Sequence, residues 1–251
     1  MTQEPLISFK NISVSFGKTT VHKDISFSIN KGETVTILGP SGTGKTVLLK
    51  LIIGLLMPTS GEIIVEGKNT KKIDESELLK LRENVGMLFQ GAALFDSLNV
   101  FENIAYSLRE KNSRVKGTYS KEDIEKIVNE RLSVVGLQNF ITRYPAELSG
   151  GQKKRIGLAR ALASSPKVVL FDEPTTGLDP TSVRMIDELI INLREEYGIT
   201  SIVVTHDIES ARRISTRWIL LAEGVVKADG IPNELLENND FVQKFIAGMW
   251  E

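Results

Sequence analysis

Residues 34–56 read TVTILGPSGTGKTVLLKLIIGLL, in which a short apolar run, a glycine-rich turn and a longer apolar run follow one another. The middle of this stretch, GPSGTGKT (39–46), matches the pattern G-x-x-x-x-G-K-[ST] of a phosphate-binding loop. Glycine lets the backbone curl until its N–H groups face phosphate oxygens, and the start of the following helix adds unpaired donors. A chance glycine-rich turn is the alternative interpretation, and the flanking strand and helix disfavour it.

Two side chains of this loop are expected to act on a nucleotide. Lys45 is expected to reach the β- and γ-phosphates of a nucleotide, and Thr46 to place its hydroxyl on Mg²⁺. A nucleoside triphosphate and Mg²⁺ are therefore the expected ligands, and the family resemblance described below implies that the nucleotide is ATP. The predicted ATP-binding residues of this segment are Gly39, Pro40, Ser41, Gly42, Thr43, Gly44, Lys45, Thr46 and Val47.

A pair of acids ends another apolar run, VVLFDEP (168–174). A buried parallel strand presents the residue at its carboxyl end to the edge of the sheet where ligands bind. Asp172 is therefore predicted to join the Mg²⁺ site, and Glu173 to orient or deprotonate an attacking water. His206 ends the run SIVVTH (201–206) and is expected at the same edge if the two strands are neighbours. An apolar strand that ends in two acids is common in proteins and indicates nothing by itself. Together with the phosphate-binding loop, it indicates a site for Mg²⁺ and an attacking water.

The bulk composition is that of a globular protein and excludes several classes of function. At 251 residues the chain can hold one large α/β domain, and its net charge of −1 argues against nucleic acid as a partner. The absence of cysteine excludes disulfides and thiolate zinc sites. The most apolar stretch, VLLKLIIGLL (47–56), is too short to span a bilayer, and MTQEPLISFK (1–10) lacks the pattern of a signal peptide. A role at a membrane would therefore need a partner.

Apolar runs typical of strands alternate with helical patterns along the chain. The strands are expected at 6–16, 34–38, 62–67, 85–89, 167–171, 200–206, 217–222 and 225–230. The helices are expected at 44–56, 75–82, 100–110, 121–135, 150–163, 181–197 and 232–248. Strands that alternate with helices predict an α/β fold with a parallel sheet.

One stretch of the chain interrupts this alternation. From about 91 to 165 only helical patterns occur, on either side of a polar loop at 110–123. We therefore expect a single domain, 1–251, with a nucleotide-binding core formed by 1–90 and 166–251 and an inserted helical subdomain at 91–165.

A second helix start rich in glycine lies in LSGGQKKRIGLARAL (148–162). Ser149 suits a helix N-cap, and the two glycines permit close approach to the backbone. Alone, this pattern fits any helix start, with the basic run at 153–155 merely solvated. In the order GPSGTGKT, Gln90, LSGGQ, VVLFDEP, GLDP (177–180) and His206, however, the sequence resembles the ATP-binding-cassette (ABC) ATPase family over nearly the whole chain.

The resemblance implies a fold and a mode of action. The implied fold is a P-loop NTPase core with a parallel sheet, an N-terminal antiparallel β region and the inserted helical subdomain. ABC ATPases form head-to-tail dimers that sandwich two ATP molecules, so LSGGQ of one copy would cap the γ-phosphate held by Lys45 of the other. The residues implied are Ser149, Gly150, Gly151 and Gln152, with Asp179 in the loop that links the two sites.

The resemblance also assigns roles at the reacting phosphate. Glu173 would be the catalytic carboxylate, and His206 would hold the γ-phosphate and the water in place. Gln90 matches the glutamine that contacts Mg²⁺ or water and connects the site to the helical subdomain.

Three further residues are matched to the rest of the nucleotide. Phe16, in VSFGK, matches the aromatic residue that stacks on adenine, with Val21 beneath the base. Val47 departs from the second hydroxyl residue that is common in the family, so about one hydrogen bond to the α-phosphate, about 0.5–1.5 kcal/mol, is expected to be missing.

The stretch QGAALFDSLNVFENIAYSLRE (90–110) narrows the resemblance within the family. It resembles the Mla/Mce-type phospholipid transporter ATPases, whereas amino-acid importer ATPases more often read LFPHLTV here. The implied function is ATP hydrolysis that drives (phospho)lipid transport through a separate integral membrane permease. An ATPase for another cargo, such as an amino-acid importer or an exporter, is the alternative. A module that binds ATP and dimerises without appreciable turnover is a third hypothesis, which Glu173 and His206 disfavour.

The implied partners are a second copy of the chain, the permease and an MCE-type lipid-binding subunit, with the chain peripheral at the cytoplasmic face of the inner membrane. A STAS-domain regulator is a further candidate, expected at the helical subdomain because the sequence ends at FIAGMWE (245–251). Tyr106 and Leu108 are expected to pack within that subdomain. The permease contact is predicted at Leu94, Phe95, Asp96, Ser97 and Leu98. The apolar residues of the last helix, Phe241, Phe245, Ile246 and Met249, are expected in the core, with a partner surface as the alternative.

Overall fold

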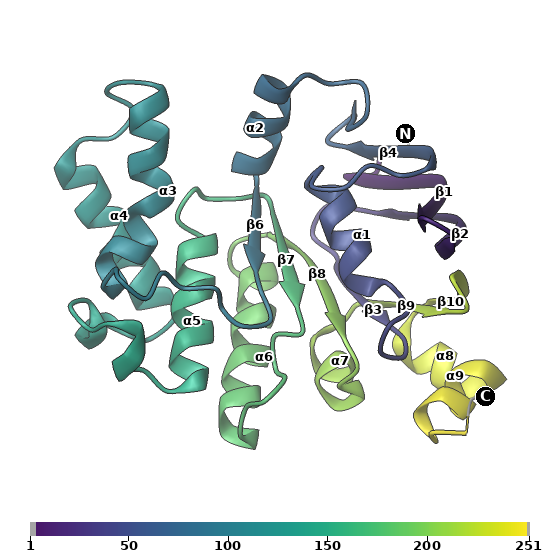
Figure 1. Cartoon of the computed structure of the whole chain (residues 1–251). Helices are drawn as coiled ribbons and strands as arrows, with labels where there is room; N and C mark the ends of the chain where they lie inside the picture. The colour runs from purple at the N-terminus through teal and green to yellow at the C-terminus, as the bar shows by residue number, and fades with distance from the viewer. Residues whose placement is uncertain (1–3, 250–251) are drawn as a thin grey trace.

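The computed structural model describes residues 4–249 and contains two β-sheets (Figure 1). A six-stranded sheet has the strand order β10-β9-β3-β8-β7-β6, and a four-stranded sheet has the order β2-β1-β4-β5. The strands are β1 Ile7–Phe16, β2 Thr19–Ile29, β3 Thr34–Leu38, β4 Ser60–Val65, β5 Lys68–Asn69, β6 Val85–Leu88, β7 Val168–Asp172, β8 Thr200–Thr205, β9 Arg217–Ala222 and β10 Val225–Gly230. The predicted fold class, including its N-terminal antiparallel region, is confirmed.

Helices cover the six-stranded sheet and extend beyond the end that carries β6 (Figure 1). They are α1 Lys45–Ile52, α2 Glu75–Glu83, α3 Val100–Arg114, α4 Lys121–Val134, α5 Gly150–Ala161, α6 Pro180–Glu195, α7 Ile208–Ile214, α8 Pro232–Asn238 and α9 Asp240–Ile246. Two short 3₁₀ turns, Gln138–Phe140 and Pro145–Glu147, lie between α4 and α5.

The central strands of the six-stranded sheet run parallel and bring the predicted site residues to one edge. Strand β8 lies between β3 and β7 and is parallel to both, with Leu38 at the end of β3 paired to Thr205. The phosphate-binding loop after β3, the acids at the end of β7 and His206 after β8 therefore leave the sheet side by side. The expectation that β7 and β8 are neighbours is confirmed.

Alternate side chains of β7 contribute to two different hydrophobic cores, because successive residues of a strand face opposite sides of the sheet. Val168 and Leu170 pack with α1 and the four-stranded sheet, whereas Val169 and Phe171 pack with residues of α3, α4, α5 and α6. The helices inserted between β6 and β7 thus share a core with the sheet. The boundaries expected for a helical subdomain, 91–165, stay a prediction.

Strand β2 has no counterpart among the predicted strands, although it pairs with β1 along most of its length. Its sequence TTVHKDISFSI does not alternate regularly, because Lys23 and Asp24 are both exposed at a bulge where Asp24 has φ 52°. On either side of the bulge, His22 and Ile25 are buried. The extra residue hides the two-residue period that would have identified the strand.

Two helices, α3 and α7, differ from expectation. Helix α3 continues to Arg114, four residues beyond its predicted end, and Arg114 forms ion pairs there with Glu110 at 3.2 Å and Glu83 at 3.6 Å. Helix α7 was not predicted. Its seven residues, capped by Asp207, are too few for a helical period to be visible in the sequence.

The predicted C-terminal helix is divided into α8 and α9. Asn239 separates them, because its side chain accepts a hydrogen bond from a backbone N–H three residues further on and so caps α9. Phe241 and Phe245 pack against the core as expected. Ile246 and Met249 are exposed, so the expectation of core packing is wrong for these two residues.

Candidate active site

The phosphate-binding loop connects β3 to α1, and its backbone requires glycine at two positions. Gly44 has φ 84° directly before the helix, where an added Cβ would overlap Val21 and lie 2.8 Å from His22 Nε2. Gly39 has φ 155°, and a Cβ there would overlap the carbonyl oxygen of Leu221. Glycine therefore allows the loop to curl tightly at the start of α1, whose first N–H groups have no partner within the helix.

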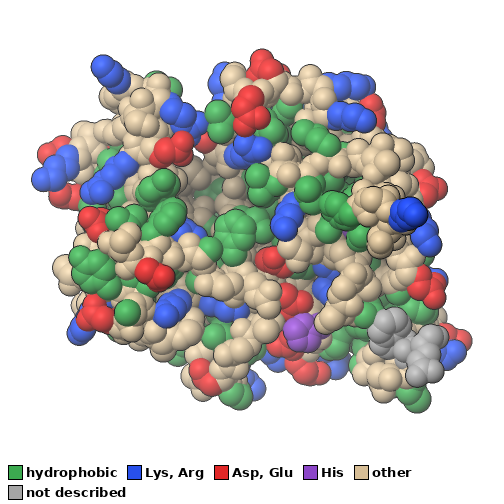
Figure 2. Space-filling model, viewed as in Figure 1, with side chains coloured by type: hydrophobic (Ala, Val, Ile, Leu, Met, Phe, Trp, Pro, Cys, Tyr) green, Lys and Arg blue, Asp and Glu red, His purple; other side chains and the backbone are tan. Residues whose placement is uncertain are grey.

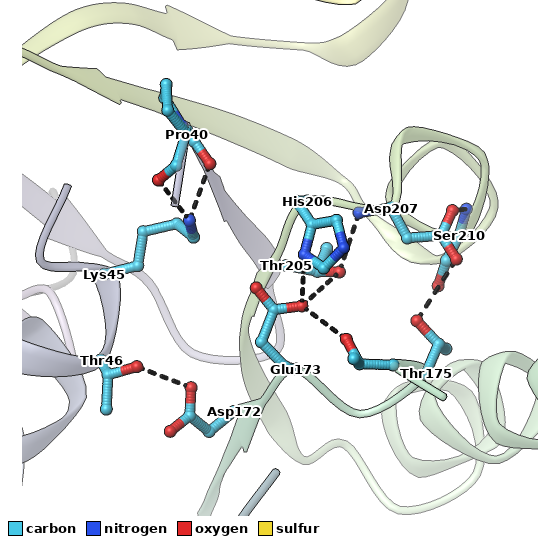
Figure 3. Close-up of polar contacts among 12 residues, drawn as sticks. Pro40, Lys45, Thr46, Asp172, Glu173, Thr175, Thr205, His206, Asp207 and Ser210 are labelled. Carbon is cyan, nitrogen blue, oxygen red and sulfur yellow. Dashed lines mark hydrogen bonds and ion pairs between the residues drawn. The ribbon is translucent and has the colours of Figure 1, made fainter. Parts of the chain in front are cut away.

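Lys45 lies inside this curl with only 7% of its surface exposed. Its Nζ donates to the carbonyl oxygens of Gly39 at 2.7 Å and Pro40 at 2.9 Å (Figure 3). Burial lowers the pKa of Lys45 below its ordinary value, while the nearby carboxylates of Glu173 and Asp172 act in the opposite direction. A buried ammonium gains stability from any anion that enters the loop, as the motif predicts.

Thr46 and Asp172 place two oxygen atoms that could bind a metal ion next to the loop. Thr46 Oγ1 donates to Asp172 Oδ1 at 2.8 Å (Figure 3). Burial raises the pKa of Asp172, the Thr46 hydrogen bond lowers it, and the charge of Glu173 raises it further. Mg²⁺ takes one or two protein oxygens and completes its shell with water and phosphate, so this donor set fits it. Within residues 4–249, no cluster of three or more His, Asp or Glu side chains suited to a metal ion occurs.

Glu173 and His206 are in direct contact at the same sheet edge. Glu173 Oε2 lies 2.9 Å from His206 Nδ1 and accepts hydrogen bonds from Thr176 Oγ1 at 3.0 Å and Thr205 Oγ1 at 3.4 Å (Figure 3). The backbone of Glu173 has φ 49°, which is uncommon for a residue with a side chain. The carboxylate is thus oriented by two hydroxyl donors and the His206 ring, and the two strand ends lie together as expected.

An open cleft of about 410 Å³ brings most of these residues together. Its lining residues are Val21, Ser41, Gly42, Gly44, Lys45, Thr46, Val47, Gln90, Glu173 and His206. Asp172 is adjacent to the cleft through its hydrogen bond to Thr46. Gly39 and Pro40 contribute carbonyl oxygens to Lys45, and Thr43 Oγ1 donates to Pro40 at 2.8 Å, so they support the loop rather than line the cleft.

Other predicted nucleotide-binding residues do not line this cleft within one chain. Phe16 ends β1 at a hairpin and is 49% exposed. Ser149 and Gln152 form a capping box at the start of α5, and Gly150 and Gly151 occupy its first turn. The Asp179 carboxylate caps α6, and hydrogen bonds from the Ser182 side chain and backbone lower its pKa.

Two buried side chains beside the site were not predicted. His22 is fully buried, and its Nε2 lies 3.0 Å from the carbonyl oxygen of Gly44. Lys154 is buried on α5 and donates to the carbonyl oxygens of Glu173 and Thr176, so the alternative interpretation of the run 153–155 as merely solvated does not apply to it. Helical spacing offers a signal, since Gly151, Lys154 and Leu158 recur at i, i+3 and i+7 on one buried face.

The segment after Gln90 has a strained backbone that α5 holds in place. Ala92 and Ala93 have φ 60° and 50°, consecutive left-handed residues without glycine. Arg160 donates to their carbonyl oxygens at 2.9 and 2.7 Å, and its guanidinium lies 5.7 Å from the centre of the Phe95 ring. The Asn103 side chain bonds to both backbone groups of Phe95 and to the Leu98 carbonyl.

These contacts leave part of the segment on the surface, at the edge of a groove of about 590 Å³. Phe95 is 42% exposed there, and Tyr106 is 47% exposed with its ring centre 4.7 Å from that of Phe95. The expected packing of Tyr106 inside the helices is therefore wrong, whereas Leu108 is buried as predicted. Figure 2 shows a hollow on this face with hydrophobic side chains around it. Leu94 and Leu98 are half-buried, and Asp96 and Ser97 are exposed.

A parallel sheet with a glycine-rich loop after one strand, an acid pair after a second and a histidine after a third defines a P-loop nucleoside triphosphatase. The chain belongs to the ABC transporter family, whose model matches residues 22–176. It is 40% identical over 245 residues to the intermembrane phospholipid transport system ATP-binding protein MlaF of Haemophilus influenzae, which covers 97% of this chain and 90% of that protein.

Similarity extends to relatives with another cargo and to solved structures. The glutamine transport ATP-binding protein GlnQ of Escherichia coli is 43% identical over 235 residues, covering 93% of this chain and 94% of that protein. The dimeric, post-hydrolysis structure of the ATP-binding cassette MJ0796 bound to ADP and Pi superimposes with a TM-score of 0.81 at 36% identity, covering 90% of this chain and 98% of that one.

The chain is therefore the ATP-binding and ATP-hydrolysing subunit of an ABC transporter. In residues 4–249, no helix has the length and apolar character needed to cross a membrane. The family and the nucleotide are thereby assigned, whereas the relatives differ in what they transport.

Proposed function

We propose that Glu173 is the general base of ATP hydrolysis and that His206 and Lys45 hold the γ-phosphate. The observation that carries this proposal is the Glu173–His206 contact at 2.9 Å in the cleft that Lys45 also lines. A carboxylate oriented by these contacts can accept a proton from a water placed over the phosphate. His206 turns Nδ1 toward Glu173, so its other ring nitrogen is left to face a phosphate oxygen.

The Mg²⁺ ion that accompanies ATP is proposed to bind between Thr46, Asp172 and Gln90. Thr46 and Asp172 already place a hydroxyl and a carboxylate oxygen side by side, and Gln90 lines the same cleft. Bound there, Mg²⁺ would neutralise charge on the phosphate oxygens. The chain itself supplies the curled loop and Lys45, which position the phosphates, and Glu173, which orients the water.

A second copy of the chain is proposed to complete each nucleotide site. The first turn of α5, with Gly150 exposed, offers unpaired backbone N–H groups that suit a γ-phosphate. Because Ser149–Gln152 does not line the cleft of its own chain, the phosphate it would meet belongs to the partner copy. Phe16 and Val21 are proposed to contact adenine, and Asp179 to lie where the two sites meet.

Replacement of Glu173 tests this scheme directly. Glu173→Gln keeps the shape of the side chain and removes its basicity, so hydrolysis should fall by about 10²- to 10⁴-fold. ATP binding should be retained, and ATP-bound dimers should accumulate in size-exclusion chromatography. Ser76, which lies in the first turn of α2 and does not line the cleft, offers a control as Ser76→Ala. Normal turnover by Glu173→Gln would show that another group is the base.

The groove beside Phe95 is proposed to receive a cytoplasmic helix of the permease. Its lining includes the tilted ring pair of Phe95 and Tyr106 next to basic and acidic residues of α3, a mixture suited to an amphipathic partner. Phe95→Asp should prevent assembly with the permease while ATP binding is unchanged. Tyr144→Asp is the control, because Tyr144 is an exposed aromatic residue outside the groove. Normal assembly of Phe95→Asp would refute this site.

Phospholipid or another apolar lipid is the proposed cargo, carried with an MCE-type lipid-binding subunit at the cytoplasmic face of the inner membrane. The likeness of residues 90–110 to Mla/Mce-type ATPases and the similarity to MlaF along 97% of the chain support it. Amino-acid import is the second candidate, supported by 43% identity to GlnQ. A STAS-domain regulator remains a candidate partner at the helices between 91 and 165.

The cargo is tested by what is purified with the chain. The intact complex, isolated in mild detergent, should contain a permease, an MCE-type subunit and lipid that mass spectrometry identifies. A permease accompanied by a soluble amino-acid-binding protein would instead support import of amino acids and would refute lipid transport.

A further inference from the structure

Lys154 is a buried cation that donates hydrogen bonds to the backbone of the turn bearing Glu173, the residue proposed as the base. It lies one helical turn after Gly151 on α5, and only 5% of its surface is exposed. Its Nζ donates to the carbonyl oxygens of Glu173 at 2.9 Å and Thr176 at 3.1 Å. Burial of an ammonium is unfavourable unless hydrogen bonds compensate, so these two contacts fix the turn to which the carbonyls belong.

The turn that Lys154 contacts holds Glu173 in an uncommon conformation. A non-glycine residue keeps a backbone conformation with φ 49° only where contacts with its surroundings compensate the conformational cost. The N–H of Glu173 donates to the Val204 carbonyl at 2.9 Å, and its own carbonyl accepts from Lys154. Both peptide groups of Glu173 are therefore anchored, one to the sheet and one to α5.

The same turn also reaches the Glu173 carboxylate. Thr176 Oγ1 donates to Glu173 Oε2 at 3.0 Å, while the Thr176 carbonyl accepts from Lys154. Lys154 thus binds both ends of the turn 173–176, and Thr176 of this turn donates to the Glu173 carboxylate. The side chain of Lys154 is not among the residues that line the cleft, so its connection with the site is through the turn that bears Glu173.

We propose that Lys154 is a positioning residue for Glu173 and ties this carboxylate to the helix that begins at Ser149. The inference rests on the proposed role of Glu173 as the base. Because Ser149–Gln152 is proposed to bind the ATP of the second copy, a movement of α5 on that nucleotide is passed through Lys154 to the turn 173–176. One copy's base is thereby made sensitive to the nucleotide held by its partner.

Replacement of Lys154 tests the inference in the full chain. Lys154→Met keeps the length of the side chain and removes its charge and donors, and Lys153→Met changes the adjacent, less buried lysine of the same helix. For Lys154→Met, kcat should fall about 10- to 100-fold, as for a small misplacement of a reacting group. The KM and dissociation constant for ATP should match those of Lys153→Met, and ATP-bound dimers should accumulate.

The outcomes separate this inference from the proposed function. If Glu173→Gln is inactive but Lys154→Met turns over like Lys153→Met, the positioning role is refuted and Glu173 keeps its assignment. If Glu173→Gln hydrolyses ATP normally, the proposed base itself is wrong. A parallel loss of ATP affinity and of melting temperature in Lys154→Met would indicate a packing role and also refute the inference. Should Lys154→Met fail to fold, Lys154→Gln carries the test, with lowered kcat at normal ATP affinity expected and unchanged kcat refuting the inference.

Discussion

Arg160 should control the backbone between the nucleotide cleft and the groove at Phe95. It is the residue that donates to the carbonyl oxygens of Ala92 and Ala93, at 2.9 and 2.7 Å, and lies over the Phe95 ring. The perturbation is Arg160→Ala, which removes both donors and the cation. We expect the segment to relax locally, because two consecutive left-handed alanines then lose the contacts that hold them.

The magnitude follows from the geometry. Left-handed backbone costs about 1–2 kcal/mol for each alanine, so about 2–4 kcal/mol is available from relaxation of Ala92 and Ala93. In the unsubstituted chain two hydrogen bonds from the charged Arg160, each about 1.5–3 kcal/mol, hold the segment against this relaxation, and the one at the surface contributes less because water competes for it. Without these bonds the local free energy of opening should fall by about 2–4 kcal/mol, which corresponds to about 30- to 700-fold faster amide exchange.

Hydrogen exchange measured by mass spectrometry or NMR provides the assay. The amides to follow are those of Ala92, Phe95 and Leu98, which donate to Phe89, Asn103 and Phe95 respectively. Arg155→Ala is the control, because Arg155 lies on the same helix and donates to the Val135 carbonyl instead. If exchange at these three amides is the same in both variants, Arg160 does not hold the segment and the reasoning is wrong.

Three other predictions concern the phosphate-binding loop. Burial lowers the pKa of His22 from its ordinary 6.5, so below that pH the unfolded chain binds more protons than the folded chain. The free energy of unfolding should therefore fall by up to about 1.4 kcal/mol per pH unit on acidification. His22→Leu should flatten the dependence of the melting temperature on pH below 6.5, and an unchanged slope would contradict this. Gly44→Ala should lower the melting temperature by about 5–15 °C, because the added methyl group would overlap Val21 at a position where φ is already unfavourable for alanine. Gly42→Ala has open space around its Cβ and should lower the melting temperature less. Equal shifts in the two variants would exclude crowding as the cause. Thr46→Val should raise the Mg²⁺ concentration for half-maximal hydrolysis about 10- to 100-fold in a titration of ATPase activity, and an unaltered Mg²⁺ dependence would remove Thr46 from the metal site.

The parts of the site that could be predicted are those in which a motif coincides with the end of a buried strand. Strands β3, β7 and β8 are buried along their whole length, and each delivers its final residue to the same edge of a parallel sheet. The placement of Lys45, Asp172, Glu173 and His206 then follows from topology, because neighbouring parallel strands cannot put their carboxyl ends at opposite edges.

The features that escaped prediction depend on contacts between segments far apart in the chain. Helical spacing can place Lys154 on the buried face of α5, but the carbonyl oxygens that it binds lie 19 and 22 residues further along the chain, and the run KKR does not reveal them. The left-handed conformation of Ala92 and Ala93 likewise has no local cause, since alanine favours helix. Tertiary hydrogen bonds override the local preference in both cases, and they do so next to the site.

These long-range contacts share one element, and that makes α5 more than a support for its first turn. Near its start Lys154 binds the turn that bears Glu173, and at its end Arg160 binds the segment that leads to Phe95. Between them Gly157 approaches so closely that an added Cβ would lie 2.9 Å from Leu88 and 3.2 Å from the Ala92 carbonyl oxygen. A helix of twelve residues is a rigid rod of about 18 Å. We therefore expect a displacement at its first turn to move both the turn that bears Glu173 and the segment that leads to Phe95.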